Sequence, residues 1–194
     1  MRQITVSTFA DKVVVLFQTI HNLDRVPRAG YVLRGVADPE SVAAHSHFVA
    51  LLALLVLEEC PDDYDRGKTL SMALIHDLAE AKLMDIPMPY ADAYLHGAKQ
   101  DAEQVIMEEM LDGFSPSLAA LHSEFVEAES PEARLLRGLD KAQMMLKIIN
   151  YEREHRGCLE EFWGNARNFN DYGIEVVSLL FDLICSHAGR PRPV

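Results

Sequence analysis

Apolar residues recur every three or four positions along nearly every long segment of this 194-residue chain. That spacing gathers them on one face of a helix, whereas the alternation typical of a half-buried strand is scarce. Turn-forming residues cluster between the periodic segments. The pattern therefore predicts an all-α fold, a single helical bundle. The expected helices cover about residues 5–21, 39–60, 65–82, 91–112, 115–128, 130–154 and 171–187.

Two of these helices open on strong start signals. Residues 38–40 (Asp-Pro-Glu) and 130–132 (Ser-Pro-Glu) each combine a capping side chain, a proline suited to the first helical position and an acid at the positive helix end. Between residues 84 and 89, two prolines prevent a helix from continuing, so we expect a loop there.

No internal repeat, low-complexity tract or flexible linker divides the chain, so we expect one domain over residues 1–194. An apolar share of 49% is ample for one buried core. The main body is expected over about residues 20–155, followed by the C-terminal helix at 171–187. A tail over residues 188–194, which contains proline and arginine, is expected to fray.

Net charge, cysteine spacing and apolar runs indicate which partners and which location to expect. A formal charge of −12 disfavours binding to a nucleic-acid polymer. The three cysteines are widely spaced without a C-x-x-C pair, as expected for reduced core thiols. No signal peptide opens the chain, and the apolar run at 13–17 is too short to span a bilayer. We therefore expect a cytoplasmic protein that does not contact the membrane.

Four residues in three separate places form a candidate ligand set for one divalent metal ion: His45, the adjacent pair His76 and Asp77, and Asp140. Each lies in a predicted helix interior, where imidazoles and carboxylates need a partner. Two nitrogens and two carboxylates suit Mn²⁺, Co²⁺, Fe²⁺, Mg²⁺ or Zn²⁺ without choosing among them. Pairing with arginines and hydrogen bonding within the core are the alternatives for each residue alone, but the four together favour the metal.

Two further features suit a hydrolytic site. Glu80 lies one helical turn after His76, where its carboxylate can transfer protons, or can simply orient His76 or pair with an arginine. Residues 25–37 contain Arg25, Arg28 and Arg34 and no acid, so a small anion could bind there.

The order and setting of these residues resemble the H…HD…D signature of the HD-domain metal-dependent phosphohydrolases, and in particular the HD-domain 5′-deoxynucleotidases. The resemblance runs in order over about residues 20–155. The segments that carry it are RVPRAGY at 25–31, PESVAAHS at 39–46, HDLAE at 76–80, DIP at 85–87, SPEA at 130–133 and LD at 139–140.

The resemblance implies an all-helical, usually dimeric enzyme that hydrolyses deoxyribonucleoside 5′-monophosphates. By position, metal would be bound by His45, His76, Asp77 and Asp140, with Asp77 and Glu80 taking part in catalysis. The resemblance further implies that Arg28 holds the phosphate and that Tyr31 and Asp85 shape the sugar pocket. Arg34 is a second candidate for the phosphate, or a structural arginine.

Two positions depart from the family. Tyr31 replaces a common tryptophan thought to press on the sugar carbon that would carry a 2′-hydroxyl. Its own hydroxyl predicts a hydrogen bond to ribose and hence tolerance of ribonucleotides. Met84 replaces a glycine before Asp85, which predicts a shift of that carboxylate.

We therefore predict a phosphomonoesterase that hydrolyses (deoxy)ribonucleoside 5′-monophosphates with metal-activated water. Its partners would be a small nucleotide and a second copy of the chain. One alternative is a phosphodiesterase or nucleoside-triphosphate hydrolase on the same scaffold, which would use a second metal or more basic groups. Another is a non-catalytic helical module that binds metal for folding, although Glu80 and Arg28 would then have no purpose.

Overall fold

The protein is described here by a computed structural model over residues 6–60 and 62–193, and within these ranges it contains helices and no strand. The predicted all-α fold is confirmed. The elements are α1 Val6–Ile20, η1 His21–Asp24, α2 Ala29–Val32, α3 Val42–Glu59, α4 Arg66–Ile75, α5 Glu80–Leu83, α6 Met88–Tyr90, η2 Ala91–Leu95, α7 Ala98–Met110, α8 Pro116–Glu127, α9 Pro131–Arg153, α10 Glu160–Gly164, η3 Ala166–Phe169 and α11 Glu175–Ala188.

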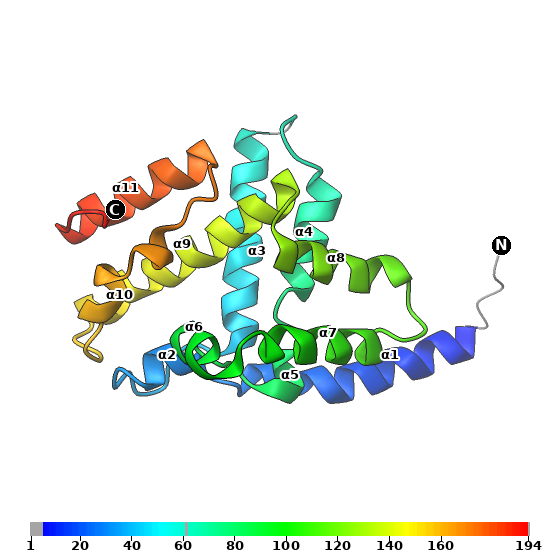
Figure 1. Ribbon diagram of the computed structural model, residues 1–194. Coiled ribbons are helices and arrows are strands. Elements are labelled where there is room, and N and C mark those ends of the chain that lie inside the picture. The colour runs from blue at the N-terminus through cyan, green and yellow to red at the C-terminus, as the bar shows by residue number, and fades with distance from the viewer. Residues whose placement is uncertain (1–5, 61, 194) are drawn as a thin grey trace.

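Helix α9 runs through the middle of the molecule (Figure 1) and contacts α3, α4, α8, η3 and α11. Because neighbours surround it, α9 buries side chains on nearly every side, as a core helix does. Helices α1, α5 and α7 lie together at the lower edge in the same view. The fully buried side chains of α9 include Leu135, Leu136, Leu139, Met145 and Ile148.

The start signal at residues 130–132 works as predicted, and the one at residues 38–40 does not. Ser130 caps α9, and its hydroxyl accepts a hydrogen bond from the Ala133 N–H at 3.2 Å. Helix α3 instead begins at Val42, capped by Ser41. Asp38 adopts a left-handed backbone with φ 49°, which turns the chain before the helix starts. Glu40 is thereby buried rather than placed at a solvated helix end.

The predicted helix over residues 65–82 is wrong, because it breaks at the His-Asp pair. α4 ends at Ile75, and the Leu78 N–H then donates to the Ile75 carbonyl at 3.1 Å, a bond to the third preceding residue. The same spacing joins Glu80 to Asp77. Such bonds tighten the turn relative to an α-helix. His76 and Asp77 therefore lie at the end of a helix rather than within one.

Helix predictions differ elsewhere too. The segment predicted as one helix over 91–112 is interrupted at His96 and Gly97, both with positive φ. The short helices α2, α6 and α10 and the one-turn helices were not predicted. The expectation of core thiols holds for Cys185 but not for Cys158, which is exposed.

The predicted frayed tail is also corrected, as far as residue 193. Arg190 pairs with Glu152 at 3.2 Å, and Arg192 pairs with Asp171 at 2.8 Å. Composition suggested a loose end, but these acidic partners lie tens of residues away and fix the arginines. Val194 lies outside the described residues.

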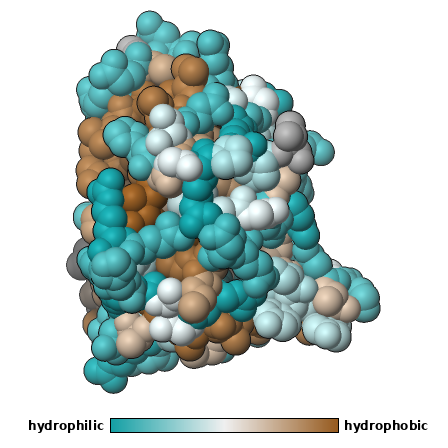
Figure 2. Space-filling view, turned by 90° about the vertical axis from the view of Figure 1, so that its left-hand side faces the viewer, coloured by the Kyte–Doolittle hydropathy of each residue, from teal (hydrophilic) through white to brown (hydrophobic). Residues whose placement is uncertain are grey.

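Helix α3 has 18 residues and a mean hydropathy of 1.5, so its length and composition alone would allow it to cross a membrane. It packs against α4 and α9 and buries His45, and 33% of the helix is buried inside the molecule. The face of the molecule that contains α10 and α11 is largely hydrophilic, with a hydrophobic patch toward its upper edge (Figure 2). Exposed apolar side chains on α3 and α11 are Phe48, Leu51, Leu55, Leu179 and Leu183.

Candidate metal centre

The structure brings all four predicted ligands together from three elements. His45 comes from α3, the His76-Asp77 pair from the turn after α4, and Asp140 from α9. His45 Nε2 lies 3.0 Å from Asp140 Oδ1, and ligand atoms of His45, His76 and Asp140 lie within 4.8 Å of one another. Asp77 Oδ2 is 3.3 Å from His76 Nε2 and 3.7 Å from His45 Nε2. Asp77 also faces Arg28, whose Nη1 lies 3.5 Å from Asp77 Oδ2.

The donor atoms fit a divalent cation. His76 Nδ1 donates to the Ala73 carbonyl at 2.8 Å, and His45 Nδ1 donates to Gln143 Oε1 at 2.6 Å. The Nε2 atoms of both rings are buried without a hydrogen-bond partner. Each is turned toward carboxylate oxygen. A neutral imidazole nitrogen and a carboxylate repel each other unless a positive charge lies between them, and a metal ion would supply it.

Charge in the site favours ionised carboxylates beside the rings. Burial opposes ionisation of Asp140, but Lys141, His45 and Arg28 hold its pKa well below its ordinary value. Burial likewise opposes ionisation of Asp77, yet His76 and Arg28 lower its pKa. Burial disfavours the charged form of His76, while the neighbouring carboxylates outweigh burial and raise its pKa. Both carboxylates are therefore favoured in the ionised form that a metal ligand needs.

Arg28 lies beside the ligand set. Its Nη1 is 3.5 Å from Asp77 Oδ2, 3.4 Å from Asp85 Oδ1 and 3.8 Å from Glu80 Oε2. The Glu80 Oε2 atom is buried without a hydrogen-bond partner. Burial, and then the charge of Asp77, raise the pKa of Glu80 well above its ordinary value. The structure thus gathers the predicted acid, guanidinium and ligands at one place.

Asp85 lies where it supports Arg28. Its Oδ2 accepts a hydrogen bond from the Ala29 N–H at 2.6 Å. Met84, which precedes it, has φ 69° and ψ 164°, a positive-φ conformation that favours glycine and costs another residue about 1–3 kcal/mol. A glycine at this position would adopt the turn without that cost.

A cavity of about 300 Å³ opens beside the centre. Tyr31 lines it but is 2% exposed, and its hydroxyl donates to the Met144 carbonyl at 3.1 Å. A main-chain acceptor 113 positions away therefore holds the proton of this hydroxyl, and its contact with a ribose stays a prediction. Arg34 also lines the cavity and pairs with Glu161. The outer wall includes Ile86, Met88, Tyr90, Phe162 and Asn165.

Sequence reasoning missed several polar residues of the cavity. Lys141 Nζ lies 3.8 Å from Asp140, and Lys99 pairs with Glu103 at 2.5 Å. The adjacency of the first and the four-residue spacing of the second were visible signals. His122 also lines the cavity, and burial lowers its pKa to about 4.

A family model described as "HD domain" matches residues 20–171 of the chain. With the fold and the ligand set described above, the chain belongs to the HD-domain family, and the predicted resemblance is confirmed. Among its relatives, 5′-deoxynucleotidase HDDC2 of Danio rerio is 31% identical over 79% of this chain and 77% of that protein. 5′-Deoxynucleotidase HDDC2 of Homo sapiens is 29% identical over 94% of this chain and 92% of that protein.

Solved structures agree on the fold. A Pyrococcus horikoshii protein matches with a TM-score of 0.73 and 34% identity, covering 89% of this chain and 96% of that one. A Magnetospirillum magnetotacticum protein titled a predicted metal-dependent phosphohydrolase has a TM-score of 0.69 and 20% identity, covering 95% and 98%. At that identity the second match supports the fold alone.

Proposed function

We propose that this protein is a divalent-metal-dependent phosphomonoesterase that releases phosphate from nucleoside 5′-monophosphates, preferring the 2′-deoxy forms. One observation carries the proposal: Arg28 lies 3.5 Å from Asp77, in the lining of a cavity that His76 and Asp140 also line, and the Nε2 atoms of His45 and His76 are buried there without a hydrogen-bond partner. A cation site and a guanidinium side by side can bind different oxygens of one phosphate group. The relatives named 5′-deoxynucleotidase support the same substrate class.

Each residue has a separate task in this proposal. His45, His76, Asp77 and Asp140 would hold the ion. When bound, the ion supplies Lewis acidity toward a phosphoryl oxygen and toward water. Arg28 donates hydrogen bonds to the remaining phosphate oxygens and balances their charge. Glu80, 3.8 Å from Arg28, is placed to accept a proton from the attacking water.

The sugar preference follows from Tyr31. Its hydroxyl proton is held by Met144, so the residue offers the cavity an aromatic ring rather than a free donor. A ribose 2′-hydroxyl placed against that ring would lose hydrogen bonds with water and gain none. We therefore expect deoxyribonucleotides to be the better substrates; Asp85 and Arg28 line the same cavity as Tyr31.

The test is phosphate release from a panel of ribo- and deoxyribonucleoside monophosphates with Mn²⁺ or Co²⁺. We expect turnover that chelation and Asp77→Ala both abolish. A folded, metal-loaded protein that is inert toward every monophosphate would refute the proposal. Lys99 and Lys141 also line the cavity, which favours a nucleoside-triphosphate hydrolase or phosphodiesterase as the competing function. Triphosphates and a diester in the panel, with the metal stoichiometry, decide between them.

Assembly and location complete the proposal. We propose a cytoplasmic homodimer, supported by the family resemblance and by exposed apolar side chains such as Phe48 and Leu183. Light scattering at several concentrations would test the dimer. A monomer at all concentrations would contradict it without bearing on the reaction.

A further inference from the structure

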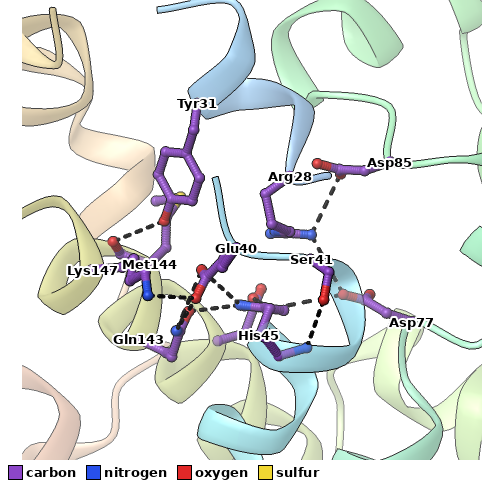
Figure 3. Close-up of polar contacts among 12 residues, drawn as sticks. Arg28, Tyr31, Glu40, Ser41, His45, Asp77, Asp85, Gln143, Met144 and Lys147 are labelled. Carbon is purple, nitrogen blue, oxygen red and sulfur yellow. Dashed lines mark hydrogen bonds and ion pairs between the residues drawn. The ribbon is translucent and has the colours of Figure 1, made fainter. Parts of the chain in front are cut away.

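A buried carboxylate that belongs neither to the ligand set nor to Arg28 lies behind the metal centre (Figure 3). Glu40, just before α3, is 7% exposed. Gln143 on α9 donates its side-chain N–H groups to it, at 3.1 Å to Oε2 and 3.4 Å to Oε1. Lys147 Nζ is 3.7 Å away and balances the charge. Burying a carboxylate costs several kcal/mol unless it is paired, so we looked for a role of Glu40 in its hydrogen bonds to Gln143.

The Glu40 carboxylate fixes which way the Gln143 amide faces. An ionised carboxylate can only accept hydrogen bonds, so the amide must turn its NH₂ group toward Glu40. Its oxygen is then directed to the opposite side, where it lies 2.6 Å from His45 Nδ1. An amide oxygen also only accepts, so the hydrogen of the imidazole must be on Nδ1.

The hydrogen on Nδ1 determines the state of the other ring nitrogen of His45, Nε2. With the hydrogen on Nδ1, the neutral ring has its lone pair on Nε2, the atom 3.0 Å from Asp140 Oδ1. Only in this tautomer can the Nε2 lone pair bind a cation. His76 reaches the same state by another route, because its Nδ1 donates to the main-chain carbonyl of Ala73. No side-chain substitution removes that carbonyl, so His76 serves as an internal reference.

We infer that Glu40, acting through Gln143, is a positioning residue that holds His45 in the Nδ1–H tautomer and reserves Nε2 for the metal. The inference rests on the proposed metal site, but its first readout does not. Whether His45 Nδ1 has the hydrogen that Gln143 accepts can be measured in the metal-free protein. Loss of an outer partner of a metal-bound histidine usually lowers metal affinity about 10- to 100-fold.

The first experiment removes the relay. Gln143→Leu keeps a similar volume and deletes both hydrogen bonds. We expect ¹⁵N spectra of the metal-free variant to show His45 as a mixture of tautomers while His76 is unchanged, and Mn²⁺ affinity to fall about 10-fold or more. Asn150→Leu, at an exposed position of the same helix, is the matched control and should keep both properties. His45 signals are assigned by their loss in His45→Asn.

The second experiment exchanges the two partners. Glu40→Gln alone lets the Gln143 amide face either way, because residue 40 can then donate as well as accept. In Glu40→Gln with Gln143→Glu, the new amide at 40 donates to the new carboxylate at 143, which again accepts from His45 Nδ1. We expect this double variant to restore the tautomer and the Mn²⁺ affinity. A role limited to packing or to balancing Lys147 predicts no such rescue.

Two outcomes would overturn the inference: an unchanged His45 tautomer in Gln143→Leu, or a folded double variant that stays as weak in Mn²⁺ binding as the single variants. Thermal unfolding verifies folding, and if the double variant is unfolded, Gln143→Leu alone decides. Absence of Mn²⁺ binding in the unsubstituted protein would refute the proposed function instead, and the spectra of the metal-free protein would still decide on the relay.

Discussion

The two opposite sides of helix α9 differ in what they do for the protein. Gly138 and Asp140 are two residues apart, about 200° around the helix. Gly138 faces α11 so closely that a Cβ there would lie 2.8 Å from Val177 Cγ1. Asp140 faces the metal centre, 3.0 Å from His45. One side is apolar and closely packed, whereas the other gathers carboxylates and unpartnered nitrogens that only a cation would satisfy.

This difference separates stability from activity within a few residues. Phe181 on α11 is fully buried and packs its ring edge against Phe169, with centroids 5.5 Å apart. Burying such a side chain stabilises the fold by roughly 2–3 kcal/mol. The carboxylates on the other side are paired with His76 and with the cationic groups of Arg28 and Lys141, and their main contribution is to the site rather than to the packed core. Substitutions on the two sides should therefore have opposite signatures.

The largest expected effect is on activity, from Asp140→Asn. Loss of one anionic ligand should reduce phosphate release by roughly 1000-fold or more, which corresponds to about 4 kcal/mol of barrier. The metal-free variant should unfold at a somewhat lower temperature than the unsubstituted protein, because Lys141, His45 and Arg28 favour the ionised form of Asp140, but the loss should be smaller than the loss from Phe181→Ala. Calorimetry in chelator and a phosphate assay measure the two. A large loss of stability would contradict the separation of the two sides.

The opposite signature is expected from Phe181→Ala. Removing this ring leaves a cavity between α9 and α11 and should lower the free energy of unfolding by about 3–5 kcal/mol. Below the unfolding transition, phosphate release per folded molecule should remain within about twofold, since α11 has no residue in the cavity beside the metal centre. Denaturant titration and an active-fraction assay test this. A selective loss of turnover in fully folded protein would show that the two sides are coupled.

Some polar residues of α9 could be predicted from the sequence, and others could not. Asp140 was identifiable because a carboxylate in an apolar helix needs a partner, and Ser130 because a capping serine precedes proline. Gln143 was not, although it too is a polar residue in that helix. Its partners, His45 and Glu40, lie about 100 positions away. The Tyr31 hydroxyl acceptor and the partners of Arg192 are of the same kind. Local patterns indicate that a polar group needs a partner but not which one it finds.

A third effect is metal-dependent stability. Mn²⁺ at 100 times its dissociation constant should stabilise the protein by about 2.7 kcal/mol, because the ion binds only the folded chain. Asp140→Asn should lose this gain, and Phe181→Ala should keep it. Thermal shift with and without Mn²⁺ measures the difference. An equal gain in Asp140→Asn would place the stabilising ion at another site.

A smaller effect is expected from Gly138→Ala. The new methyl group would press on Val177, which costs roughly 1–3 kcal/mol, while alanine recovers about 1 kcal/mol of helix propensity. We expect a net loss of about 1 kcal/mol with unchanged Mn²⁺ affinity. Val177→Ala in the same chain should remove the steric cost, so the two substitutions together should be less harmful than their sum. Additive effects would mean that the helices simply move apart.

The smallest effect comes from Glu132, at the start of α9 and distant from both sides. Its carboxylate accepts hydrogen bonds from the Asp65 N–H and from Lys68, each at 3.1 Å. Burial opposes ionisation of Glu132, but these two donors lower its pKa. A lowered folded-state pKa gives stability that is present above the unfolded value of about 4.3 and is lost as pH falls through the folded value.

Glu132→Gln should therefore lower the free energy of unfolding by about 0.5–1 kcal/mol at pH 7, and the deficit should shrink below about pH 4.3. Denaturant titrations at several pH values measure it. Glu58→Gln removes an exposed pair with Arg66 and is the matched control, expected to change little at any pH because solvent screens that pair. If the Glu132→Gln deficit were the same at every pH, the stability would come from the shape of the contact rather than from the charge.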